Sequence, residues 1–358
     1  MAAPSASGNS GIQADEASLA EPHEQRDAER TFLKLLELTR RGVLPAKLLP
    51  AVSNLQTALS EDPCSRCHLL ALSHDELGVI FEGLADPLQP ELAVVFSSTC
   101  KGLRTPLWAA LEELEGQHQD AKELCCHVPD YDAESGTRLP MSCARLADAE
   151  ELICILDELP VEAMSTLSMI LRTNGLPKLQ ELDLADHQFS DARAQPLFEG
   201  LCPGSLPSLQ SFNICGNNIG PAGAEALAAA LRRGAMPKLE GLTLGCNPIG
   251  HQGVAALAAP LRKMPALSQL LLNDCEIGDE GVAALVDNLG KDDFKALVGL
   301  DLEANLLTDK GCATLVDAIK AGSFPSLDEV FLRGDCVSVE AEAALKAAVS
   351  ARKAVRLE

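Results

Sequence analysis

The second half of the chain repeats itself with a period close to 30 residues, and this period constrains its fold more than any other feature. Six units begin with the pattern L-x-x-L-x-L-x-x-N-x-I, at Leu179, Leu209, Leu239, Leu267, Leu297 and Leu327. A degenerate seventh copy begins one period earlier, at Ala149. A unit of this size cannot bury its apolar face alone, so successive units must stack on one another.

The order of residue types inside one unit predicts its local structure. Leu242 and Leu244 are followed by Asn247, then by Gly253 and an alanine-rich stretch. The alternation places both leucines on the inner side of a short strand. The asparagine side chain can satisfy backbone groups where the chain turns out of the strand. The glycine suits a close approach at the start of a helix.

Stacked units of this kind predict an α/β fold, because each contributes one strand and one outer helix. Helices are wider than strands, so the array curves into a right-handed solenoid, or horseshoe, with a parallel concave sheet. The predicted strands lie near 151–155, 181–185, 211–215, 241–245, 269–273, 299–303 and 329–333. The predicted helices lie near 161–172, 191–202, 221–233, 251–262, 279–289, 309–320 and 339–350.

Composition excludes several classes of protein. The net charge is −23, from 52 acidic and 29 basic residues, so binding to phosphate backbones or anionic membranes is disfavoured. No apolar run is long enough to span a bilayer. The first 30 residues lack the basic and apolar regions of a secretory signal. The 13 cysteines are therefore expected as reduced thiols in a cytoplasmic or nuclear protein.

The first half divides differently. Residues 1–27 are rich in small and charged residues and predict a disordered tail. Residues 28–145 predict an all-α region, with a polar loop from Val128 to Pro140. The repeat domain then covers residues 146–358, with seven units.

Residues 149–350 resemble leucine-rich repeats of the ribonuclease-inhibitor type, which also occur in RanGAP-like and NLR-family proteins. Five consecutive units keep four or more positions of the motif. The asparagine is replaced by His187, Cys275 and Asp335 in three of the units. The resemblance implies a protein-binding horseshoe.

Residues 72–104 resemble an F-box, from Leu72-Ser-His-Asp-Glu-Leu through Cys100-Lys-Gly-Leu-Arg104. The family's proline is Ser73 here, and its usual tryptophan is Leu103. An F-box before leucine-rich repeats implies a substrate receptor of a cullin-type ubiquitin ligase, bound to an Skp-type adaptor. The residues that would bind the adaptor are Leu77, Ile80, Phe81, Leu84, Leu92 and Leu103.

No arrangement of residues predicts catalysis, a cofactor or a firm metal site. Cys64, Cys67 and His68 could meet Cys125, Cys126 and His127 around zinc, but the second group has an awkward spacing, and chance is the favoured explanation. Cys215, Cys246 and Cys275 fall at nearly equivalent places in three units. They could form a row of thiols, although small soft residues also suit a tight turn after a strand.

The alternation of the strands also predicts which side chains line the concave face. They are Glu151, Glu181, Asp183, Asp186, Ser211, Asn213, Thr243, Gln269, Asn273, Asp274, Asp301, Glu303, Glu329, Phe331 and Arg333. Eight of these residues are acidic and one is basic, a larger acidic excess than in the whole chain, which has 52 acidic and 29 basic residues. This indicates either the solvated face of an acidic protein or a surface for a basic partner.

Two functions remain open at this stage. The first is a non-catalytic adaptor whose N-terminal helices bind an Skp-type protein and whose concave face selects a client. The second is a repeat scaffold or sensor without a ubiquitin role, in which the N-terminal helices cap the array. A GTPase activator is a third class, but no catalytic residue can be named for it.

Overall fold

The computed structural model describes residues 81, 84–90, 93–94, 97, 107–131, 138–154, 159, 162–173, 175–287, 289–290, 293–334 and 336–357. Residues 85–90 and 112–358 form one compact unit, which contains the whole repeat array. The predicted tail at 1–27 and the helices predicted before residue 81 lie outside the described residues.

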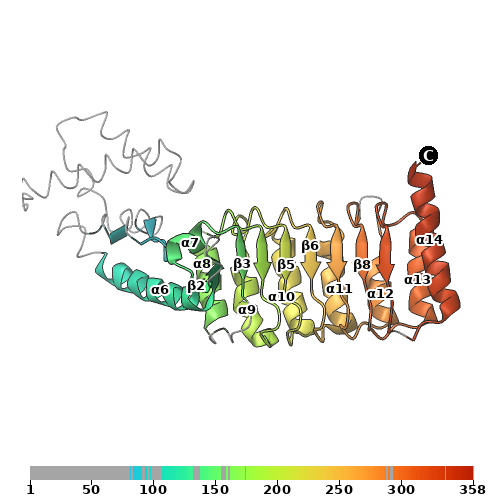
Figure 1. Ribbon diagram of the computed structural model, residues 1–358, viewed down its shortest axis with the longest axis horizontal. Coiled ribbons are helices and arrows are strands. Elements are labelled where there is room, and N and C mark those ends of the chain that lie inside the picture. The colour runs from blue at the N-terminus through green and yellow to red at the C-terminus, as the bar shows by residue number, and fades with distance from the viewer. Residues whose placement is uncertain are drawn as a thin grey trace, which may run out of the picture. The chain divides into compact units, whose positions relative to one another are not determined.

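Seven parallel strands form one sheet in the order of the sequence, as the repeat predicts (Figure 1). The strands are β3 (Glu151–Ile153), β4 (Glu181–Asp183), β5 (Ser211–Asn213), β6 (Gly241–Thr243), β7 (Gln269–Leu271), β8 (Gly299–Asp301) and β9 (Glu329–Phe331). Each residue pairs with the equivalent residue of the next unit, so that Leu270 lies opposite Leu300. The predicted strands are confirmed in number and order and begin at the predicted residues.

A helix follows each of these strands and covers the other face of the sheet (Figure 1). The helices are α8 (Ala163–Thr173), α9 (Asp191–Gly200), α10 (Pro221–Arg232), α11 (Gly250–Leu261), α12 (Asp279–Val286), α13 (Asp309–Lys320) and α14 (Val339–Leu357). The fold is thus the predicted α/β solenoid. The open face of the sheet, opposite the helices, is called the concave face below.

The segment before the first repeat differs from its prediction. Helix α6 (Trp108–His127) is followed by an antiparallel pair, β1 (Pro129–Tyr131) and β2 (Arg138–Pro140), and by α7 (Cys143–Ala147). The expected polar loop at 128–140 is therefore wrong in part, because its two ends pair as a hairpin. Apolar side chains of this segment, including Leu124 and Leu146, join the same hydrophobic core as the repeats. They close the N-terminal end of the array.

Each strand contributes one inward side chain at its centre to the core. Leu182, Phe212, Leu242, Leu270 and Leu300 are each at most 1 % exposed. Each lies between equivalent residues of the neighbouring strands, so units bury one another's leucines. Among the inward residues of β4 to β9, only Val330, in the last strand, is partly exposed.

The predicted role of the asparagine is confirmed in detail. The buried Asn305 side chain accepts hydrogen bonds at Oδ1 from the backbone N–H groups of Cys275 and Ile277, at 3.0 and 2.9 Å. Its Nδ2 donates to the carbonyl oxygens of Leu272 and Leu302. Asn217 and Asn247 each accept one such bond at Oδ1 and make the equivalent donations from Nδ2 in their units. The asparagines thus form a ladder that joins each unit to the one before it.

Two other residue types continue this ladder. His187 lies 2.8 Å through Nε2 from the carbonyl oxygen of Cys154. The Cys275 sulfur lies 3.3 Å from the carbonyl oxygen of Leu244. A thiol sulfur is a weaker acceptor than an amide oxygen. In the loop before Cys275, the Ile249 N–H donates to the backbone carbonyl oxygen of Asn247, and Gly250 adopts a left-handed φ of 64°.

A second set of cross-unit bonds joins the starts of the helices. The Asp279 carboxylate accepts from the Thr308 N–H, the Thr308 hydroxyl and the Gly311 N–H of the next unit, at 2.7 to 3.0 Å. Asp191 accepts from Gly220 in the same way. A Cβ on Gly311 would collide with the Asp279 carboxylate, which explains the glycine at that position.

The hydrogen bonds to Asp279 predict an acid-dependent contribution to stability. Burial alone raises the pKa of this carboxyl, but the hydrogen bonds from Thr308 and Gly311 outweigh that effect and hold the pKa below its ordinary value of 3.8. The ionised form is therefore bound more strongly in the folded state, and that stabilisation is lost as pH falls through the folded pKa.

We expect Asp279→Asn to be less stable than the parent at pH 7, and the difference to shrink from about pH 5 downward. Urea unfolding of both proteins between pH 7 and pH 3 measures this. A difference that stays constant over that range would contradict the assignment.

Candidate functional site

The register of the sheet arranges the concave side chains in rows across the strands. One row runs through Glu151, Glu181, Ser211, Gly241, Gln269, Gly299 and Glu329. The next runs through Ile153, Asp183, Asn213, Thr243, Leu271, Asp301 and Phe331. All residues of these two rows are at least partly exposed, except the buried Gly299. The residues between the rows are buried, except the partly exposed Val330.

Acidic residues gather at the N-terminal side of this face. Glu181, Asp183 and Asp186 come from β4 and the turn after it, and we call them the N-terminal acidic cluster. Asp183 also has a structural role, because Oδ1 accepts from the Ala185 N–H and Oδ2 accepts from Asn213 Nδ2 at 3.0 Å. Asp186 is exposed, in a left-handed conformation with φ 62°.

The strands in the middle of the face, β5 to β7, carry uncharged side chains on it, some of them small and some, such as Gln269 and Leu271, larger. Gly241 and Gly245 lie on and after β6, beside the half-exposed Thr243. A Cβ on Gly245 would collide with the amide of Asn273 on the next unit. The Asn273 side chain therefore fills the space beside Gly245, whereas a Cβ on Gly241 would meet no other atom within 4 Å.

A second acidic group lies toward the C-terminal side. We call Asp274, Asp301, Glu303 and Glu329 the C-terminal acidic cluster. Asp301 accepts from the Glu303 N–H at 2.9 Å, as Asp183 does in its own unit. Arg333 lies 3.9 Å from Glu303 and its side chain is 84 % exposed, so this ion pair is loose. Phe331 is exposed beside them.

The three repeat cysteines do not form an accessible row. Cys275 is buried, and burial raises its pKa to about 12. Burial also raises the pKa of Cys215 to about 11, with Cys246 as the second cause. Cys246 is exposed and accepts a weak contact from Asn273 Nδ2 at 3.8 Å. The thiols of Cys215 and Cys275 are therefore protonated near neutral pH. A protonated thiol is a poor nucleophile, so this favours a packing role for both residues over a reactive one.

The hypothetical zinc ligands are only partly within the structure. Cys64, Cys67 and His68 lie outside the described residues. Cys125 is buried with its sulfur 3.8 Å from that of Cys143, while Cys126 and His127 are exposed. Within the described part of the chain, no three His, Cys, Asp or Glu side chains are placed to hold a metal ion.

Most of the predicted adaptor-binding residues also lie outside the described residues, namely Leu77, Ile80, Leu92 and Leu103. The two that are described, Phe81 and Leu84, are 2 % and 4 % exposed. A side chain that binds an adaptor must be accessible, so the burial of these two residues does not favour that role.

Sequence reasoning missed one feature, a hollow at the C-terminal end of the array between β9 and α14. Its lining residues include Val330, Leu345, Lys346 and Val349. In the described part of the chain no further strand follows β9 in the sheet, and the repeat pattern alone gives no sign of the hollow. Among the helices that the structure describes, none is long and apolar enough to cross a membrane.

Comparison with known proteins agrees with the repeat. A leucine-rich repeat family model matches residues 205–228 and 265–286. No curated protein matches the chain. Among solved structures, the chain is similar to leiomodin-1 actin-binding site 2, with 13 % sequence identity and a TM-score of 0.35. That match covers 55 % of this chain and 92 % of the other.

The structural repeat and the sequence match lead to the same conclusion. Seven parallel strands alternate with outer helices, and buried asparagines join the units at the positions that the repeat predicts. Two of these units carry the sequence signature of the family model. The chain therefore contains leucine-rich repeats and folds as a leucine-rich repeat solenoid.

Proposed function

We propose that this chain is a non-catalytic protein-interaction module whose concave face binds a partner that presents lysine or arginine side chains. The observation that carries the proposal is the pair of acidic clusters, centred on β4 and β8 and separated by strands with uncharged side chains on this face. Four strand spacings separate β4 from β8, which is about 19 Å. Two basic groups at that separation on a partner would meet one cluster each.

The charges on this face support attraction rather than simple solvation. Among the concave side chains that the structure describes, Arg333 is the one basic residue, at the edge of the sheet. Asp183 and Asp301 are fixed by hydrogen bonds from the backbone, so their charges are held in place. Like charges gathered on a low-dielectric wall raise the local potential and speed the approach of a cationic partner.

Affinity capture with a charge-neutralised variant tests this proposal. The variant carries Glu181→Gln, Asp186→Asn, Asp274→Asn and Glu329→Gln, and these changes keep the side-chain shapes. Asparagine suits positions 186 and 274 because both have left-handed backbone conformations, with φ 62° and 52°. We expect the variant to capture none of the proteins that the parent captures at low salt. The parent should also lose these proteins at about 0.5 M salt.

The matched control removes the same number of charges from the other side of the array. It carries Glu162→Gln, Glu199→Gln, Glu225→Gln and Asp317→Asn, all at exposed positions. Mass spectrometry of the captured proteins should give the same set for the control as for the parent. If the concave variant captures the same proteins as the control, the face is only a solvated surface and the proposal is wrong.

A more specific form of this proposal is that the chain is a substrate receptor of a cullin-type ubiquitin ligase. It rests on the F-box resemblance of residues 72–104, and the burial of Phe81 and Leu84 does not favour it. The alternative is a scaffold or sensor without an adaptor. The same captures separate them, because an Skp-type adaptor and a cullin retained by both variants would support the ligase role.

A further inference from the structure

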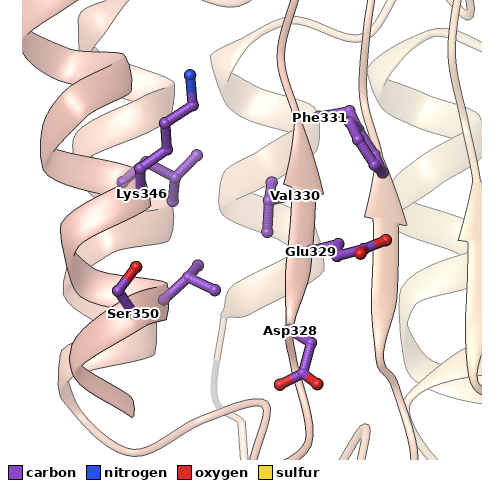
Figure 2. A pocket seen from close by; sticks show the side chains of 8 residues that line it. Asp328, Glu329, Val330, Phe331, Lys346 and Ser350 are labelled. Carbon is purple, nitrogen blue, oxygen red and sulfur yellow. The ribbon is translucent and has the colours of Figure 1, made fainter. Parts of the chain in front are cut away.

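The C-terminal end of the array holds a hollow of about 220 Å³ between β9 and α14 (Figure 2). Val330 projects into it from β9, while Lys346 and Ser350 lie on the opposite wall, on α14. Leu345 and Val349 complete the apolar part of the lining. Val330 faces the helix side of the strand, but Glu329 and Phe331, which also line the hollow, belong to the rows of the concave face. The hollow therefore lies along the edge of β9.

The preceding units show what normally fills this place. At every earlier step of the sheet, the next strand lies against the inward residue, and Leu300 is covered in this way by Val330. In the part of the chain that the structure describes, no strand follows β9 in the sheet. Val330 therefore stays partly exposed, and the outer edge of β9 presents backbone groups that a further strand would pair.

The polar rim of the hollow indicates the charge of its occupant. Glu329 is exposed and lines the hollow together with Asp328. Lys346 is 2.5 Å from Glu342 of the same helix, so its charge is already balanced. A basic side chain next to Glu329 would therefore find an uncompensated carboxylate.

We propose that an extended segment of a partner protein binds here as an additional strand, parallel to β9. The register of the sheet defines its pattern, since Gly299 lies opposite Glu329 and Leu300 opposite Val330. The segment would carry a basic residue beside Glu329, an apolar residue over Val330, and a second apolar residue two positions later. Backbone pairing supplies affinity in this mode of recognition, and alternate side chains supply specificity.

A short probe peptide tests the proposal directly. It has the sequence of residues 239–245, with Gly241→Lys to supply the basic residue, and a fluorescent label at its N-terminus. We expect saturable binding to the full chain by fluorescence anisotropy. Val330→Lys should weaken binding by about tenfold or more, because a charge replaces the apolar contact. Val339→Lys is the control, because Val339 is 77 % exposed and does not line the hollow.

Charge reversal distinguishes this site from a general attraction to an acidic protein. Glu329→Lys should weaken binding of the lysine peptide, and a peptide with glutamate at the same position should bind that variant better than the parent. Thermal melting of each variant shows whether it is folded. If charge reversal of the peptide does not restore binding, the register is wrong and the proposal fails.

Backbone methylation tests whether the peptide adds as a strand. In a parallel ladder, alternate N–H groups of the added strand face β9. N-methylation at the position of Thr243 should abolish binding, while methylation at Leu244 should not. Equal effects of the two would overturn the proposal. Sedimentation of the chain alone is the last check, since self-association that Val330→Lys abolishes would make a second copy the occupant instead.

Discussion

Replacing Leu300 with alanine should lower the free energy of unfolding by about 2–5 kcal/mol, because it leaves a cavity between two stacked units. The Leu300 side chain is fully buried and lies between Leu270 and Val330 in the sheet. Each unit depends on both neighbours for the burial of its leucine. The loss should therefore reduce amide protection in the adjacent units as well as in β8.

Urea unfolding followed by circular dichroism measures the first effect, and hydrogen exchange measures the second. Leu271→Ala is the matched control, because Leu271 lies one strand away but faces the half-exposed concave side. It should cost far less than the Leu300 change. If the two variants unfold alike, the inward and outward assignment of the strands is wrong.

The sequence period predicts the solenoid because it records a physical requirement of every interior unit. Each must offer an inward residue, an asparagine and a small residue at a helix start, so these types recur at fixed spacing. The strands are shorter than predicted, with three residues instead of five. Beyond the third residue, Leu184 and Asp186 still donate to Asn213 and Cys215 of the next unit. The pairing continues, but the backbone is already turning out of the sheet.

The hairpin before the first repeat could not be predicted from its residue pattern. Each of its strands has three residues and contains a proline, Pro129 or Pro140. Proline lacks the N–H that a strand ladder needs, and it usually argues against a strand. Pairing of β1 with β2 depends on where α6 ends and α7 begins, which is a tertiary effect rather than a local signal.

The candidate site is predictable in part. Alternation along a strand identifies the concave side chains, and the acidic excess follows from simple inspection. It does not reveal that Asp183 and Asn213 bond to each other, or that Gly250 adopts a left-handed conformation and donates its N–H to the Cys275 carbonyl oxygen. The hollow beside Val330 is also invisible to a periodic pattern, because a pattern describes interior units and the hollow exists where they stop.

Replacing Asn305 with alanine should be as damaging as the loss of a core leucine, although it removes no large apolar group. Its Oδ1 accepts from two buried backbone N–H groups, those of Cys275 and Ile277. Its Nδ2 donates to the carbonyls of Leu272 and Leu302. A buried donor without a partner costs about 1–3 kcal/mol, so two donors alone predict about 2–6 kcal/mol.

The matched control is Asn273→Ala, since Asn273 is a half-exposed asparagine on the concave face of the adjacent unit. Its Nδ2 makes one weak contact, to the Cys246 sulfur, and this change should alter stability by no more than about 0.5 kcal/mol. Urea unfolding of both variants gives the comparison. Hydrogen exchange should show faster exchange at Cys275 and Ile277 in Asn305→Ala only. Unchanged protection at these two amides would mean that the asparagine ladder does not hold the units together.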